Sequence, residues 1–161
     1  MIPEYKPLIN LISKIRTMKK IIFPFLLLIS LSGFSQDNNL TVIGNKNAVP
    51  AQLTYSELQG IFLGNKPQWS NGGKVIIAMM KLNTPGGKAT CDKLFRMTPD
   101  QVTKHWLGVS IKGTIDAPVF LNSAAEVQSF VSANSGAIGI INEVASAANT
   151  KTVLIDGKKT F

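Results

Sequence analysis

The stretch from Thr54 to Trp69 constrains the fold of this chain more than any other part of the sequence. Thr54 and Glu57 have the three-residue spacing of a capping box, in which each side chain binds a free backbone N–H at the start of a helix. Gly64 stands where a helix ends in a left-handed residue, and Pro67 prevents continuation. The apolar residues between these signals recur at helical spacing, at Leu58, Ile61 and Phe62. The stretch therefore predicts a short amphipathic helix, followed by Trp69 as a large apolar anchor.

Two blocks of the sequence resemble motifs of the periplasmic phosphate-binding proteins, the solute receptors of phosphate ABC transporters. Residues 53–69 contain Leu-Thr-x-x-Glu-Leu-x-x-Ile-Phe-Leu-Gly-x-x-x-x-Trp. Residues 134–140, Asn-Ser-Gly-Ala-Ile-Gly-Ile, are similar to the family's Pro-Gly-Ala-Ile-Gly-Tyr strand entry, with Ser135 in place of Pro and Ile140 in place of Tyr. The blocks occur in the family's order, and the resemblance covers residues 40–155. It implies a solute-binding fold.

The first 35 residues are expected to lie outside the fold. A basic start at Met18 is followed by an almost wholly apolar run over residues 21–31 and by small residues before Gln36. This order is typical of a signal peptide over residues 18–35, cleaved before Gln36. A membrane anchor is the alternative, although spanning a bilayer takes roughly 20 apolar residues. We interpret Met18 as the true start and residues 1–17 as a spurious upstream extension; if they are translated, they lengthen the basic leader region.

The single cysteine, Cys91, bears on the compartment. An exported chain with one cysteine forms no internal disulfide, so burial of its core must hold it together. Cys91 is also far from the cleavage point, which argues against a lipoprotein. We therefore expect a periplasmic protein released from its signal peptide, with Cys91 as a small buried side chain of a helix.

Charge and length limit the classes of function. The chain has 17 Lys and Arg against 9 Asp and Glu, and residues 36–161 keep a net charge of +4. This balance suits an anionic ligand, whereas the charges are not concentrated with aromatic residues as in a nucleic-acid reader. Residues 36–161 are the size of one domain, too short for the two lobes of the receptors that the chain resembles.

The remaining pattern alternates strands and helices. After the second strand we expect a helix from about Lys88 to Met97. A further helix, capped by Thr98, is expected to follow it. Ser123 and Glu126 predict a further capping box, after a loop over residues 110–122, and residues 142–149 predict a helical turn. The predicted strands are residues 40–43, 74–79, 137–141 and 151–155. The order indicates an α/β fold, a periplasmic-binding-protein-like lobe with a short mixed sheet flanked by helices on both faces.

The candidate ligand site lies directly after the strand at residues 74–79. In the family that the chain resembles, this strand leads to an Arg and a Ser-Gly-Thr-type turn at a helix N-terminus, where backbone amides, hydroxyls and the helix dipole hold phosphate. The resemblance implies an anion site here, with two lysines as cations, one hydroxyl and a cradle of amides. The expected anion-binding residues are Lys81, Thr84, Gly86, Gly87 and Lys88.

This turn also departs from the family's pattern. Lys81 replaces Arg and loses the planar bidentate fork, and Pro85 removes one N–H donor. A turn that merely connects strand to helix would use the glycines equally well. If the site is real, a β-branched residue at Gly87 is expected to abolish anion binding and to leave the fold intact.

No catalytic or metal-binding constellation can be assembled from the sequence. His105 is the only histidine and has no cysteine or second histidine with which to share a metal. We therefore expect binding without chemistry, no catalytic residues, no metal and no cofactor. The first hypothesis is an exported solute-binding domain for phosphate or another oxyanion that serves an inner-membrane permease or another membrane complex. The alternative is a periplasmic interaction module on the same fold, without transport. The oligomeric state stays open.

Overall fold

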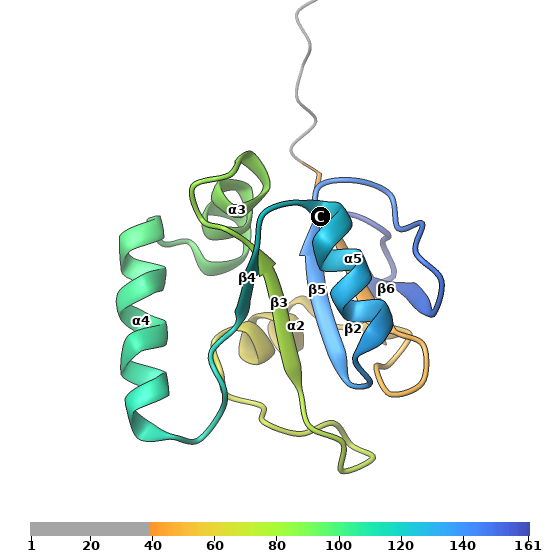
Figure 1. Cartoon of the computed structure of the whole chain (residues 1–161), viewed down its shortest axis with the longest axis horizontal. Helices are drawn as coiled ribbons and strands as arrows, with labels where there is room; N and C mark the ends of the chain where they lie inside the picture. The colour runs from red at the N-terminus through yellow and green to blue at the C-terminus, as the bar shows by residue number, and fades with distance from the viewer. Residues whose placement is uncertain (1–38) are drawn as a thin grey trace, which may run out of the picture. The chain divides into compact units, whose positions relative to one another are not determined.

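The computed structural model describes residues 39–161 (Figure 1), so the predicted extension and signal peptide lie outside the described residues. A six-stranded sheet with the order β2-β6-β1-β5-β3-β4 forms the centre of the domain. The strands are β1 (Thr41–Asn45), β2 (Gln52–Leu53), β3 (Ile76–Met80), β4 (Val119–Leu121), β5 (Ala137–Ile141) and β6 (Thr150–Ile155).

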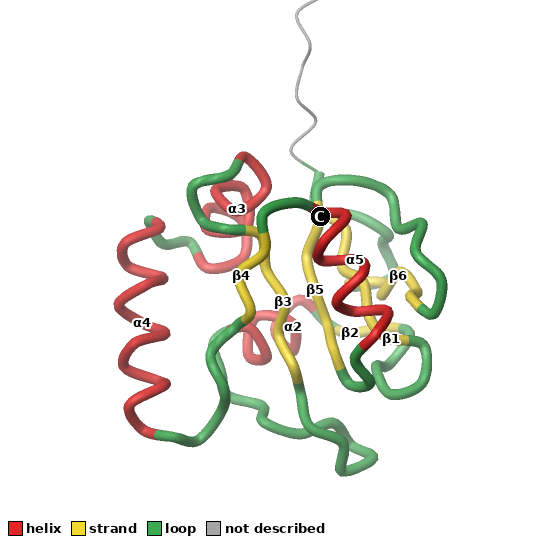
Figure 2. The backbone as a smooth tube through the Cα atoms, viewed as in Figure 1, coloured by secondary structure: helices red, strands yellow, loops and turns green. Residues whose placement is uncertain are grey.

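The sheet is mixed: some neighbouring strands pair antiparallel and others parallel. β1 pairs antiparallel with both β5 and β6, whereas β3 pairs parallel with β5 and β4. The carboxyl ends of β3, β4 and β5 therefore meet at one edge of the sheet. The three strands lie side by side as yellow segments in Figure 2. In open α/β sheets, ligands bind at this edge.

Helices cover both faces of the sheet, which confirms the predicted α/β class. The helical elements are α2 (Tyr55–Phe62), α3 (Pro85–Thr90), the π-helix η2 (Cys91–Phe95), α4 (Pro99–Lys112) and α5 (Ala124–Ala133). α5 lies in front of the sheet in Figure 1 and α2 behind it. Val127 and Val131 of α5 pack on Ile43 and Ala78 of the sheet, and the larger core on the other face contains Leu58, Phe62 and Trp106. No helix within residues 39–161 is long and apolar enough to cross a membrane.

The predicted signals at both ends of α2 are confirmed. The backbone N–H of Thr54 donates to the Glu57 carboxylate at 2.8 Å, and the Glu57 N–H donates to the Thr54 hydroxyl at 3.2 Å. The first of these bonds holds the pKa of Glu57 below its ordinary value. At the other end Gly64 has φ +80°, and the N–H groups of Gly64 and Asn65 donate to the carbonyls of Ile61 and Gly60. This is the Schellman arrangement that a left-handed glycine allows.

Several predicted elements were wrong in extent. The helix expected from Lys88 begins at Pro85, and its second half widens into a π-helix. The loop expected over residues 110–122 contains the last turn of α4 and the whole of β4. Residues 142–149 form bends and a turn rather than a helical turn.

The capping box expected at Ser123 is only half formed. The Glu126 N–H donates to the Ser123 hydroxyl at 3.2 Å, but the Glu126 carboxylate accepts from the N–H of Asn122 at 2.9 Å instead of the N–H of Ser123. Asn122 also donates its side-chain amide to the same carboxylate. Asn122, the residue before the N-cap, therefore takes the Glu126 carboxylate that a complete capping box would give to Ser123. The three-residue spacing alone does not predict this exchange.

Side chains of α2 complete the end of η2. The π-helix ends at Arg96, a left-handed residue with φ +53° whose N–H donates to the Cys91 carbonyl. The Tyr55 hydroxyl donates to the Lys93 carbonyl, and the Gln59 amide donates to the Leu94 carbonyl at 3.0 Å. These bonds satisfy carbonyls that the end of a helix leaves free.

The two motif blocks found in the sequence meet in the folded chain. The indole N–H of Trp69, which is 3% exposed, donates to the carbonyl of Gly136 at 2.9 Å. The same carbonyl accepts from the N–H of Ile76 at 3.2 Å, directly before β3 pairs with β5. Gly136 has φ +82°, and a Cβ there would lie 2.3 Å from the carbonyl oxygen of Lys74. The contact therefore needs a glycine at this position.

The two buried tryptophans allow a matched test of this bond. Trp106 is as buried as Trp69, but its indole N–H has no hydrogen-bond partner within residues 39–161. Trp69→Phe is expected to lower the free energy of unfolding by about 1 kcal/mol more than Trp106→Phe, because only the first change removes a hydrogen bond. Urea denaturation of both variants measures the difference. Equal losses would show that the Trp69–Gly136 bond contributes nothing beyond ring volume.

Candidate functional site

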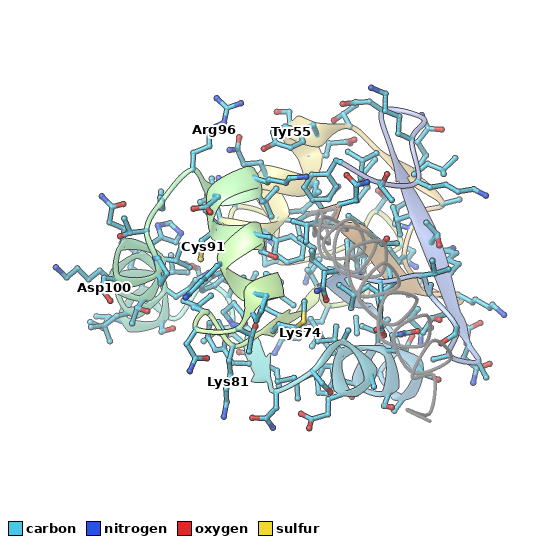
Figure 3. All side chains as sticks on the ribbon, turned by 90° about the horizontal axis from the view of Figure 1, so that it is seen from above. Tyr55, Lys74, Lys81, Cys91, Arg96 and Asp100 are labelled. Atoms are coloured by element: carbon cyan, nitrogen blue, oxygen red, sulfur yellow. The ribbon has the colours of Figure 1, made fainter. Side chains whose placement is uncertain are left out.

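The predicted anion-binding residues lie on the loop between β3 and α3 and on the first turns of α3. Thr84 is the N-cap residue of α3, with extended backbone angles, and Pro85 occupies the first helical position. Gly86 and Gly87 are buried, whereas Lys81 and Lys88 are exposed. Figure 3 shows Lys81 projecting outward from the domain. The loop therefore has the layout that the resemblance implies, a strand followed by a cation, a hydroxyl and the start of a helix.

Most polar groups of this turn already bind one another. The Thr84 hydroxyl accepts from the N–H of Gly87 at 3.1 Å and donates to the carbonyl of Lys81 at 2.7 Å. The N–H of Lys88 donates to the Thr84 carbonyl at 2.9 Å. Of the three amides expected to form a cradle, only that of Gly86 has no protein partner among the described residues. A hydroxyl has a single proton, so Thr84 donates to an anion only when it releases Lys81.

The charged groups of the loop remain available. Within residues 39–161 one ion pair is present, between Lys74 and Asp116, and it lies outside this loop. The ammonium groups of Lys81 and Lys88 therefore carry uncompensated positive charge near the start of α3. The partial positive charge of the helix N-terminus adds to theirs.

The structure adds neighbours that the sequence analysis missed. Asn122 follows β4 and Asn142 follows β5, so both reach the edge at which the Lys81–Lys88 loop begins. The Asn142 side chain would lie 3.2 Å from a Cβ on Gly86, and the Lys81 N–H donates to the Leu121 carbonyl at 2.8 Å. These segments come together because β4 and β5 both pair with β3. The sequence does not predict this arrangement, because its pattern indicates a loop where β4 forms.

The start of α5 is less suited to an anion than the start of α3. The Glu126 carboxylate lies in its first turn and accepts from Asn122, as described above. The negative charge of this carboxylate would repel a bound anion. The positive groups at this edge are therefore on the β3–α3 side.

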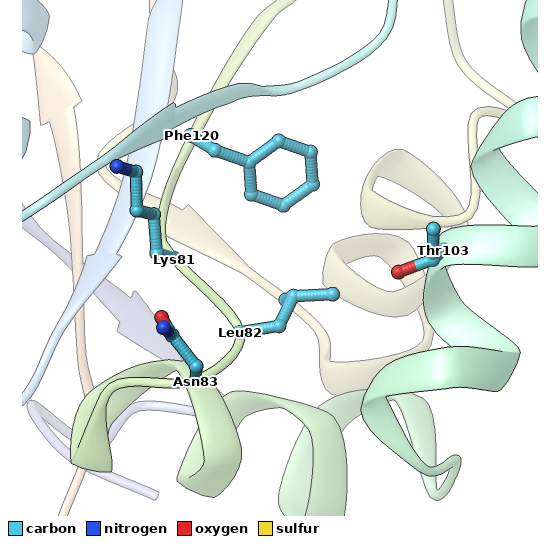
Figure 4. A pocket seen from close by; sticks show the side chains of 5 residues that line it. All are labelled: Lys81, Leu82, Asn83, Thr103 and Phe120. Atoms are coloured by element: carbon cyan, nitrogen blue, oxygen red, sulfur yellow. The ribbon is translucent and has the colours of Figure 1, made fainter.

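A hollow of about 330 Å³ opens beside the loop (Figure 4). It lies between the end of β3, the edge strand β4 and helix α4. The lining side chains are Lys81, Leu82, Asn83, Thr103 and Phe120. Leu82 and Phe120 make its surface largely apolar, so the hollow itself is better suited to an apolar group than to a naked anion.

The other reactive side chains have structural partners. The His105 ring nitrogen Nε2 lies 3.0 Å from the carbonyl oxygen of Leu63. Cys91 is fully buried, as predicted, and burial raises the pKa of its thiol to about 11. Among residues 39–161 no three His, Cys, Asp or Glu side chains are grouped so as to hold a metal ion.

Comparison with known proteins identifies relatives in fold. No family model and no curated protein sequence matches the chain. An ABC-type phosphate transport receptor from Vibrio cholerae superposes with a TM-score of 0.58 at 16% sequence identity, covering 76% of this chain and 48% of the receptor. A protein from Clostridium perfringens assigned as a phosphate ABC transporter substrate-binding protein, with bound phosphate, superposes with a TM-score of 0.51 at 17% identity, covering 74% of this chain and 46% of that one.

These superpositions define the class of the fold, that of periplasmic solute-binding proteins, at the level of a distant relationship. The matched part spans about half the length of each of the two proteins.

Gly87 is a point of close packing as well as a candidate ligand residue. A Cβ on Gly87 would lie 2.1 Å from the carbonyl oxygen of Lys81, which belongs to the backbone. The expectation that a β-branched residue at Gly87 leaves the fold intact was therefore wrong, because the loop has to move to admit any side chain.

Two helical glycines test this packing. Gly87→Ala is expected to destabilise the protein by about 2–4 kcal/mol because it overpacks the β3–α3 loop. Gly108→Ala, on α4 with open space around it, is expected to stabilise by about 0.5–1 kcal/mol through helix propensity. Chemical denaturation measures both. A neutral Gly87→Ala would mean that the loop adapts and that the close approach to Lys81 is not a constraint.

The raised pKa of Cys91 predicts a loss of stability in alkali. The unfolded thiol loses its proton near its ordinary value of 9.0, whereas the folded thiol keeps its proton until about pH 11. The unfolded state therefore binds fewer protons in this window, and the free energy of unfolding falls as pH rises, by about 2–3 kcal/mol. Denaturation curves from pH 8 to 11 for the parent and Cys91→Ala isolate this part. The same pH dependence in both proteins would contradict it.

Proposed function

We propose that this chain is an exported solute-binding domain that holds phosphate or a similar oxyanion at the start of α3. The observation that carries the proposal is a pair of ammonium groups without an ion pair among residues 39–161: Lys81 on the β3–α3 loop and Lys88 in α3, at the carboxyl edge of the parallel strands. The fold supports it, because the two superposed proteins are phosphate receptors by description and one contains phosphate.

Binding would proceed without chemistry. Lys81 and Lys88 would supply charge, and the Gly86 amide would supply a donor that has no partner among residues 39–161. Thr84 would turn its hydroxyl from the Lys81 carbonyl to the anion, while Gly87 and Lys88 would keep their amides in the cap. A ligand on one lobe is open to solvent, and water and salt weaken contacts between exposed charges. We therefore infer weaker binding than a closed two-lobed cleft provides.

Export and partners belong to the same proposal. The signal peptide proposed over residues 18–35 would deliver the domain, residues 36–161, to the periplasm. There it would serve an inner-membrane permease or another membrane complex.

The alternative is an interaction module on the same fold without a tight small-molecule ligand. One observation favours it: the polar groups of Thr84, Gly87 and Lys88 are already bound within the cap, while the adjoining hollow is largely apolar. The two functions differ in whether anions stabilise the protein.

Thermal unfolding of the full chain with phosphate, sulfate or arsenate separates them. An anion at a hundred times its dissociation constant is expected to add about 2.7 kcal/mol to the free energy of unfolding. Lys81→Ala and Lys88→Ala are expected to reduce this gain, whereas Lys158→Ala, at the exposed end of the chain, leaves it unchanged. Sodium chloride at matched ionic strength controls for screening. No gain with any of the three anions would favour the interaction module.

A further inference from the structure

The edge strand β4 leaves main-chain groups open. Among the described residues it is the last strand of the sheet, and its one pairing partner there is β3. The Leu121 carbonyl accepts from the Lys81 N–H, so Leu121 directs its main-chain groups towards β3. Because these directions alternate along a strand, the N–H and C=O of Phe120 face away from β3. An open strand edge of this kind is a template for a further strand.

Apolar side chains gather beside this edge. Four large apolar residues are exposed within residues 39–161, and three of them, Leu107, Ile111 and Phe120, lie on α4 and β4. Leu107 and Ile111 follow Thr103 at four-residue spacing on α4, so they continue the helix face that lines the hollow. The opposite face of α4 packs into the core through Val102 and Trp106. The exposed face is therefore not used by the fold.

The positive charge beside the open edge of β4 comes from Lys81, which lines the hollow and forms no ion pair within residues 39–161. On the exposed face of α4, Lys104 and Asp100 offset one another in charge. Residues 39–161 as a whole carry 12 Lys and Arg against 7 Asp and Glu. A partner with carboxylates would be attracted to this side of the domain.

We propose that the open edge of β4 and the facing side of α4 bind an extended, acidic peptide segment of a partner protein. The segment adds a seventh strand to the sheet and pairs its main chain with Phe120. Apolar side chains at alternate positions enter the hollow and contact Leu107, and a carboxylate reaches Lys81. A helix would satisfy neither main-chain group of Phe120, whereas an extended strand satisfies both.

Selection of short random peptides displayed against the full-length chain tests the proposal. The enriched peptides are expected to alternate apolar and other residues, to contain Asp or Glu, and to tolerate no proline in the pairing segment. Methylation of alternate backbone nitrogens on the pairing side is expected to abolish binding of a synthetic copy. Enrichment of peptides with helical i, i+3, i+4 spacing, or of none, would overturn the proposal.

Matched variants locate the binding surface. Leu107→Asp is expected to weaken an enriched peptide by about tenfold or more, whereas Val144→Asp, the same change at an exposed apolar residue away from this edge, leaves binding unchanged. Phe120→Ala removes the ring only, and Phe120→Pro also removes the outward N–H, so the proline variant should bind about tenfold more weakly than the alanine variant.

Other outcomes are equally decisive. Peptides that bind Leu107→Asp and Phe120→Ala as well as the parent would place the site elsewhere. Concentration-dependent dimerisation in sedimentation, lost in Phe120→Pro, would assign the edge to a second copy of this chain and overturn the peptide. Far-UV circular dichroism and melting of each variant establish that it is folded, and Leu107, being exposed on α4, can be replaced without disturbing the core.

Discussion

The carbonyl of Gly136 is the contact on which the arrangement of the domain depends. It accepts one hydrogen bond from the buried Trp69 indole and one from the N–H of Ile76, so it joins the segment after α2 to the start of both β3 and β5. Because β3 pairs parallel with β5, the segment from Lys81 to Lys88 lies at the carboxyl edge of the parallel strands. A buried carbonyl with two donors is costly to disrupt, because each broken bond leaves a polar group without water.

The same loop has two physical roles that compete. As a helix cap, Thr84 binds the Gly87 amide and the Lys81 carbonyl, which stabilises the turn. As an anion site, it would have to exchange one of those partners for a ligand. Lys81 and Lys88 have no such conflict, since their ammonium groups form no ion pair with any residue that the structure describes. Charge attraction would therefore come first, and rearrangement of the cap would set how tightly the anion is held.

Much of the local structure could be predicted from short-range rules. The caps at Thr54 and Thr98 and the left-handed Gly64 depend on residues within about one turn, so spacing alone identifies them. The sequence also located the β3–α3 loop, because a continuous apolar run and two glycines mark it. It missed β4, a three-residue strand whose pairing with β3 is set by distant residues, and the widening of η2, whose free carbonyls are satisfied by Tyr55 and Gln59 of another helix.

Rules that act between neighbours along the chain were therefore enough for the alternation of helices and strands, for most of their caps and for the position of a polar, glycine-containing turn after a buried strand. Folding was needed to place that turn beside the ends of β4 and β5, to engage its amides largely with Thr84, and to leave β4 as an open apolar edge next to α4. The division has one cause. Caps and periodicity arise from neighbours along the chain, whereas strand order and the competition for each hydrogen bond arise from residues that meet only when the chain has folded.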